Sequence, residues 1–176
     1  MKNISYLDVV AFWLIVDIET TERGSSMSSE TATTGSLPGL FGLHVLMIED
    51  DEDARQLLAD VFQFAGATVT ACRDAYVGLG NLDERRPDVI VCDLALPRMD
   101  GLAFLRALRG HPDPKTRRTP MIAVTAYYEL YSPNELRAMG CDAYMAKPLN
   151  LDRICAAVAK LGFLAARHRE KYKASP

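Results

Sequence analysis

Acidic, hydroxyl and cationic side chains stand at the ends of several short apolar segments of this sequence. They are Glu49, Asp50, Asp93, Thr125 and Lys147. Taken singly, each has an ordinary explanation, since an acid after a strand often caps the next helix and threonine is a common strand residue. Coincidence is a poor explanation for all of them together, and the pattern indicates one shared site.

The acids of this set need a positive charge. Two carboxylates about 4 Å apart repel by roughly 4 kcal/mol at an effective dielectric of about 20, so a cluster must bind a cation or take up protons. A hard divalent ion suits Glu49, Asp50 and Asp93, and Mg²⁺ favours a few carboxylates together with water and phosphate. The set predicts phosphoryl transfer, in which an aspartate can be the nucleophile. Thr125 and Lys147 would supply a hydrogen bond and a charge to the phosphoryl oxygens.

The apolar segments that carry these residues alternate with helical patterns. Strands are predicted at 43–48, 68–72, 88–92, 121–126 and 142–146. Helices are predicted at 54–66, 74–86, 101–110, 132–140 and 150–169, with a loop at 111–120. This alternation predicts an α/β fold, a five-stranded parallel sheet that is doubly wound, with helices on both faces. Sites in such sheets lie beyond the carboxyl ends of the strands, where the residues above are expected.

The helix at 54–66 carries the clearest pattern. Its predicted apolar face comprises Leu57, Leu58, Val61, Phe62 and Ala65. Gly66 follows this face, and glycine commonly ends a helix. Asp51 or Asp53 is expected to cap the start of the helix.

Four ordered motifs then point to a family. They are VLMIEDDEDAR (45–55), PDVIVCDLALPRMDGL (87–102), MIAVTA (121–126) and GCDAYMAKPL (140–149). Over about residues 43–161 the chain resembles the receiver domain of bacterial two-component response regulators, of the single-domain, chemotaxis-regulator-like kind. The resemblance implies a flavodoxin-like receiver fold and a phosphorylation-dependent signalling switch, with no enzymatic turnover beyond slow self-dephosphorylation.

The resemblance also assigns roles to the site residues. Asp93 would accept a phosphoryl group from a sensor histidine kinase or a phosphotransfer protein. Asp50 and Asp93 would bind Mg²⁺ directly, Glu49 would help through water, and the backbone carbonyl of Ala95 would be a further ligand. These assignments agree with the chemistry inferred from the residues alone.

The remaining roles concern the response to phosphorylation. Thr125 would donate to the phosphoryl group and Lys147 would pair with it, while Tyr144 matches the aromatic switch position and Pro148 the family's cis peptide. Movement of Thr125 toward the new oxygens would let Tyr144 turn inward. The face formed by the helix at 132–140, the strand at 142–146 and the last helix would change, and a downstream protein would respond.

Two other classes of function compete with this interpretation. One is a Mg²⁺-dependent aspartyl-phosphate hydrolase, but similar phosphatases carry a second aspartate two residues after the nucleophile, where this chain has Ala95. The other is a scaffold that works without phosphorylation. The absence of the second acid favours a residue that holds its phosphoryl group long enough to signal.

The segment after Thr125 departs from many receivers. Ser132 and Glu135 form a capping-box pattern and Pro133 suits a first helical position, so the helix should start late and be short. The preceding loop carries Tyr127, Tyr128 and Tyr131. They are expected either to anchor a partner or to pack on the domain itself.

Composition and chain ends set the remaining expectations. Residues 1–39 are predicted to be an N-terminal extension and flexible linker, with an over-extended start as one explanation, followed by a receiver domain at 40–162 and a helix end and tail at 163–176. The net charge of −3 gives no general basic field for nucleic acid. The apolar run at 9–16 is shorter than the about 20 residues that span a bilayer. Four scattered cysteines fit a reducing compartment, so a cytoplasmic location is expected, and the oligomeric state stays open.

Overall fold

The structure, a computed structural model, describes residues 37–126 and 130–173. The strands are β1 (His44–Ile48), β2 (Thr68–Cys72), β3 (Val89–Asp93), β4 (Met121–Thr125) and β5 (Ala143–Ala146). The helices are α2 (Glu52–Phe64), α3 (Ala75–Arg85), α4 (Gly101–Arg109), α5 (Pro114–Arg117), α6 (Pro133–Ala138) and α7 (Leu151–Lys173). Each predicted strand and helix has a counterpart among these elements.

The five strands form one parallel sheet in the order β2-β1-β3-β4-β5. The prediction of a five-stranded, doubly wound parallel sheet is confirmed. Because β2 lies on one side of β1 and β3 on the other, the direction of winding reverses between β1 and β3. Every residue of β3 and β4 is buried, as expected of central strands covered on both faces.

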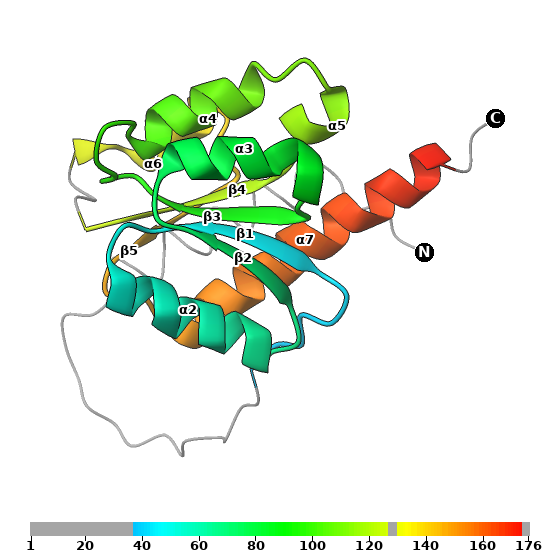
Figure 1. Ribbon diagram of the computed structural model, residues 1–176, viewed down its shortest axis with the longest axis horizontal. Coiled ribbons are helices and arrows are strands. Elements are labelled where there is room, and N and C mark those ends of the chain that lie inside the picture. Colours follow the sequence, from blue (N-terminus) through cyan, green and yellow to red (C-terminus); the bar gives the residue numbers. More distant parts are fainter. Residues whose placement is uncertain (1–36, 127–129, 174–176) are drawn as a thin grey trace. The chain divides into compact units, whose positions relative to one another are not determined.

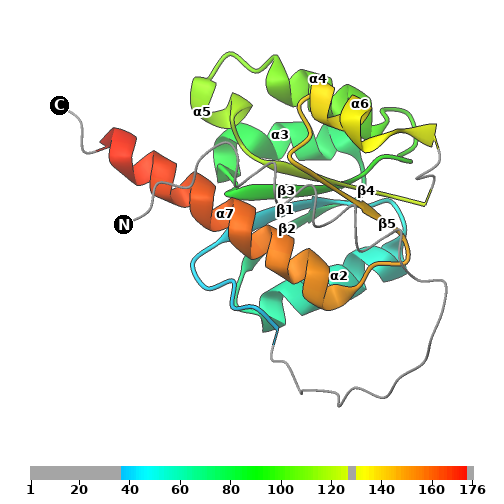
Figure 2. The same cartoon turned by 180° about the vertical axis from the view of Figure 1, so that it is seen from behind.

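Helices cover both faces of the sheet. Helices α2 and α7 lie on one face, and α3, α4 and α6 lie on the other (Figures 1 and 2). Phe62 of α2 and Phe104 of α4 are completely buried, so a packed aromatic side chain supports the sheet from each side. The four cysteines are also buried, and none forms a disulfide.

Helix α2 shows one error in the predicted apolar face. Asp51 caps it by accepting a hydrogen bond from the Ala54 amide at 2.8 Å, which confirms that part of the prediction. Leu58 and Phe62 are buried as expected, but Leu57 is 56% exposed. The five predicted positions cover a wide arc, whereas a helix lying on a flat sheet buries a narrower stripe.

The predicted loop at 111–120 contains the short helix α5. Asp113 caps it by accepting from the Lys115 amide at 2.9 Å, and Pro114 occupies its first turn. A helix of four residues shows no apolar periodicity, so only the cap and the proline could have signalled it. The late, short α6 is confirmed, and Ser132 and Glu135 form the predicted capping box.

Parts of the sequence-based expectations fall outside the described residues. These parts are positions 1–36 of the predicted extension, Tyr127 and Tyr128, and positions 174–176 of the tail. The last helix continues to Lys173, four residues beyond its predicted end at 169. None of the helices within the described ranges has the length and hydrophobicity needed to cross a bilayer.

Candidate functional site

The residues singled out in the sequence lie at the carboxyl edge of the sheet. Asp93 is the last residue of β3 and Thr125 the last of β4, while Glu49 directly follows β1 and Lys147 directly follows β5. Strands β1 and β3 flank the point where the winding reverses, which is where open α/β sheets place their ligand sites. The fold therefore brings these predicted residues to one place.

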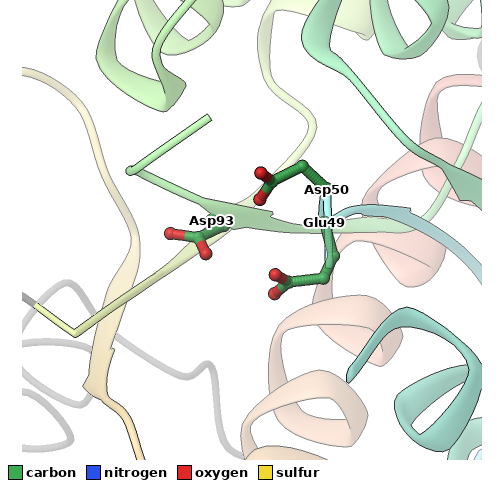
Figure 3. Close-up of side chains that lie close together, drawn as sticks. All are labelled: Glu49, Asp50 and Asp93. Carbon is green, nitrogen blue, oxygen red and sulfur yellow. The ribbon is translucent and has the colours of Figure 1, made fainter. Parts of the chain in front are cut away.

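Three carboxylates form the centre of this site. Glu49, Asp50 and Asp93 can each offer one oxygen such that the three oxygens lie within 4.8 Å of one another. Figure 3 shows the three side chains pointing toward a common space from the ends of two strands. Glu49 and Asp93 are buried, with 2% and 5% of their surface exposed, whereas Asp50 is open to solvent.

Lys147 is shared between two of these acids. Its Nζ donates to Asp93 Oδ2 at 2.6 Å and to Glu49 Oε1 and Oε2 at 3.0 and 2.8 Å. Burial works to lower the pKa of Lys147, but the hydrogen bonds to Asp93 and Glu49 outweigh it and the pKa lies above its usual value. The ammonium is therefore charged at neutral pH. Sequence reasoning placed Lys147 at the phosphoryl group, and it did not predict the contact with Glu49.

The carboxyl group of Glu49 is both buried and close to a second acid. Burial raises the pKa of its carboxyl, the hydrogen bond from Lys147 opposes that rise, and the nearby Asp93 carboxylate adds to it. One ammonium cannot neutralise three carboxylates that crowd the same space. The donor set consists of carboxylate oxygens, which are the ligands that Mg²⁺ and other hard divalent ions prefer, so the residues present fit such an ion.

The segment after Asp93 is fixed by its backbone. The Ala95 amide donates to Asp93 Oδ1 at 2.8 Å, so both oxygens of Asp93 have a partner. Gly101 begins α4 so close to the end of β3 that a Cβ there would collide with the Asp93 carbonyl oxygen and lie 2.8 Å from the Leu94 Cα. A side chain at position 101 would push the helix away from the site.

Thr125 and Tyr144 stand on neighbouring strands in a suitable relation for a switch. Thr125 pairs with Ala146, and Tyr144 lies two residues earlier on β5, which places both side chains on the same face of the sheet. Thr125 is 1% exposed and Tyr144 is 9% exposed, so in this conformation the tyrosine ring is already largely buried. The Lys147–Pro148 peptide bond that follows β5 is cis, and the Lys147 amide donates to the Thr125 carbonyl at 2.8 Å.

Two arginines near the site were not singled out from the sequence. Arg55 of α2 donates through Nη1 to the backbone carbonyls of Glu49 and Asp50, at 2.9 and 3.0 Å. Arg98, in the loop after β3, donates to Asp74 at 2.7 Å. Neither contact follows from periodicity or spacing, because each joins a side chain to a group whose position depends on the tertiary fold. Tyr131, from the predicted aromatic loop, is half-buried.

The fold and the site together define a class of protein, and comparison with known proteins agrees. The family model of the response regulator receiver domain matches residues 45–159, so the chain belongs to this family, whose members act in two-component signalling. The chain is 33% identical over 109 residues to the polar-differentiation response regulator DivK of Brucella anthropi, covering 62% of this chain and 87% of DivK.

Two further comparisons define the extent of the likeness. The chain is 30% identical over 110 residues to the regulatory protein AtoC of Escherichia coli, covering 62% of this chain and only 23% of AtoC. The crystal structure of the chemotaxis response regulator CheY4 of Vibrio cholerae superimposes with a TM-score of 0.60 at 26% identity, covering 68% of this chain and 98% of that chain. The predicted family and the flavodoxin-like receiver fold are confirmed.

Proposed function

We propose that this protein is a phosphorylation-dependent switch of a two-component phosphorelay and that Asp93 is its phosphoryl acceptor. The observation that carries the proposal is the convergence of three carboxylates beside one shared lysine at the carboxyl edge of the sheet. The donor would be a phosphohistidine on a sensor histidine kinase or a phosphotransfer protein. The phosphorus–nitrogen bond breaks as a bond forms between phosphorus and a carboxylate oxygen of Asp93, and the imidazole is the leaving group.

The residues around Asp93 have separate tasks in this transfer. Asp50, Asp93 and the Ala95 carbonyl would hold Mg²⁺, with Glu49 assisting through water, and the ion would supply positive charge to the phosphoryl oxygens. Lys147 already contacts Asp93 Oδ2 at 2.6 Å and stays protonated, so it can pair with the transferred group without crossing the site. Catalysis here is positioning and neutralisation of charge.

The response to phosphorylation would pass through Thr125. The phosphoryl group adds about −1.5 to −2 charges near neutral pH, and the Thr125 hydroxyl is expected to move toward its oxygens. Tyr144 lies on the same face of the sheet, and its ring would settle into the space that Thr125 leaves. Tyr144 is only 9% exposed here, so its side chain is largely buried in this conformation, and the phosphoryl group would shift the population toward the arrangement with the ring beside Thr125. The face of α6, β5 and α7 would then bind a downstream protein.

The unit that performs this function is residues 40–162, and we place it in the cytoplasm with its kinase. A Mg²⁺-dependent hydrolase is the alternative from another class. The position two residues after Asp93 is the exposed Ala95, whose methyl group cannot donate a proton to a leaving group. The protein is therefore proposed to retain its phosphoryl group rather than to turn over substrate.

Acetyl phosphate separates these functions. We expect intact-protein mass spectrometry to show one added phosphoryl group after incubation with acetyl phosphate and Mg²⁺, and none in Asp93→Asn. Rapid turnover of small phosphate esters, with no covalent adduct, would support the hydrolase instead. A protein that is neither modified nor active on esters would favour a scaffold independent of phosphorylation.

A further inference from the structure

The loop that joins β3 to α4, residues 94–100, contains a backbone conformation that its residue type does not favour. Arg98 has a φ of 68°, in the left-handed region where glycine is the usual residue. Glycine would adopt this conformation without a side-chain penalty, whereas an arginine here needs contacts in the surrounding structure that offset the cost. Residues held in this way are typically fixed by surrounding contacts and cluster near functional sites.

The Arg98 side chain reaches out of the loop to the start of α3. Its Nη2 donates to Asp74 Oδ2 at 2.7 Å, and its guanidinium lies 5.9 Å from the centre of the Tyr76 ring. Asp74 is itself fixed, because its Oδ1 accepts from the Val77 amide at 2.9 Å and caps α3, and its side chain is 5% exposed. The anchor is thus a buried acid attached to a helix end.

The same loop is also held by hydrogen bonds near both of its ends. At the first end, the Ala95 amide donates to Asp93 at 2.8 Å. At the other end, the Gly101 amide donates to the Leu94 carbonyl at 3.1 Å, closing the loop on itself. The Arg98–Asp74 pair adds an attachment from the middle of the loop to a different loop of the same sheet edge.

We infer that the Arg98–Asp74 pair is a positioning device for the metal site: it fixes the loop that presents the Ala95 carbonyl. This inference rests on the proposed function, in which that carbonyl is a ligand of Mg²⁺. A carboxylate ligand can adjust by rotating its side chain, but a backbone carbonyl is placed wholly by the conformation of its loop. Fixing the loop before the ion arrives reduces the ordering that binding must impose.

Positioning and simple electrostatics predict opposite results for Arg98. Removing a cation near an acidic site should strengthen the binding of Mg²⁺ if charge alone matters. Removing the attachment of the loop should weaken binding. Arg98→Gly is suited to this question because glycine accepts the left-handed backbone and so keeps the loop's native path available. Asp74→Asn removes the ion pair from the other side while its amide oxygen can still cap α3.

The test is titration of each purified protein with MgCl₂ alone by isothermal calorimetry, alongside urea unfolding in EDTA. We expect both variants to bind Mg²⁺ roughly tenfold more weakly than the wild type, a typical loss when an outer partner of a metal site is removed. The double variant should bind no more weakly than either single one, because the pair acts as a unit. Arg73→Ala is the control, since its guanidinium lies 3.8 Å from Asp74 on a side chain that is 78% exposed, and its removal should not weaken binding.

Two results would overturn the inference, and they differ in what else they overturn. In the first result, the wild type binds Mg²⁺, Asp50→Asn abolishes binding, and Arg98→Gly binds at least as tightly as the wild type. The metal site would then stand and the positioning role would be wrong. This conclusion would hold even if Arg98→Gly were less stable. If the wild type itself shows no binding of Mg²⁺, the proposed metal site and the positioning role both fail.

Discussion

The two edges of the sheet differ in how their cationic side chains are balanced by acids. At the carboxyl edge, Lys147 is divided between Glu49 and Asp93, and Asp50 adds a third acid beside them. At the amino edge, Arg109 donates hydrogen bonds to four acceptors. Its Nε donates to the Gly140 carbonyl, Nη1 to the carbonyls of Arg117 and Thr119, and Nη2 to Asp142 at 2.6 Å.

This difference distinguishes a cluster with balanced charge from the cluster at the proposed phosphorylation site, where the charge is not balanced. The Arg109 cluster pairs one cation with one acid, and Asp142 also accepts from the Met121 amide at the start of β4, so the cluster joins β4, β5 and α4. The carboxyl edge keeps more negative charge than its lysine can neutralise. A closed cluster stabilises the fold, whereas an open one costs stability and leaves room for a ligand.

The largest expected effect is loss of the closed cluster. Arg109→Ala should lower the free energy of unfolding by about 3 kcal/mol, the lower end for removing one partner of a buried pair, since this pair is partly exposed. Urea unfolding followed by far-UV circular dichroism measures it. Arg109→Lys keeps the charge but loses the planar guanidinium, so its free energy of unfolding should lie between those of the wild type and Arg109→Ala. A loss in Arg109→Ala below about 1 kcal/mol would show that the cluster is not structural.

The next effect concerns the three carboxylates at the carboxyl edge of the sheet. Free Mg²⁺ at about 100 times its dissociation constant should stabilise the wild type by about 2.7 kcal/mol, because the proposed site would hold the ion only in the folded state. Asp50→Asn should lose this increment and Arg109→Lys should retain it, as judged by unfolding with and without Mg²⁺. Equal stabilisation of all three proteins would mean that the ion acts away from the acidic site.

A smaller effect compares one acid from each edge in EDTA. Asp50→Asn should raise the free energy of unfolding by about 0.5–1 kcal/mol, because it relieves repulsion between Asp50 and the neighbouring carboxylates. Asp142→Asn should lower it by about 1.5 kcal/mol, since it loses a charge-assisted hydrogen bond. The prediction is that the two variants change the free energy of unfolding in opposite directions. Changes in the same direction would remove the distinction between the two edges.

The smallest effect is a dependence on pH at Asp74. The hydrogen bond from the Val77 amide, followed by the contact with Arg98, holds the pKa of Asp74 below its usual value. A lowered pKa stabilises the fold above the ordinary aspartate value of about 3.9, and this contribution disappears as the pH falls through the pKa of the folded state. The difference in stability between wild type and Asp74→Asn should therefore be constant near neutral pH and shrink below about pH 4. A difference that grows toward low pH would contradict the assignment.

The sequence was sufficient for the parts of the molecule that depend on local pattern. Apolar segments located the strands, and because parallel strands all end at one edge, the positions of Glu49, Asp93, Thr125 and Lys147 followed from the fold class. Local rules likewise predicted the late start of α6 at Pro133. These features need no knowledge of distant contacts.

What the sequence missed depends on the tertiary arrangement. The exposure of Leu57 is set by how α2 lies on the sheet, and the contact of Lys147 with Glu49 joins residues 98 positions apart. Arg98 gave no signal because its unusual φ and its partner Asp74 appear only when two loops meet. The closed cluster around Arg109 was missed for the same reason, since most of its acceptors are backbone carbonyls.

We propose that the carboxyl edge of the sheet is a Mg²⁺-dependent phosphoryl-acceptor site centred on Asp93. Its most direct test is to treat the protein with acetyl phosphate with and without Mg²⁺, and to locate the phosphoryl group by peptide mass spectrometry. We expect modification of Asp93 alone, dependent on Mg²⁺ and retained in Arg109→Lys. Modification at another residue, or modification of Asp93 that is equally fast in EDTA, would contradict it.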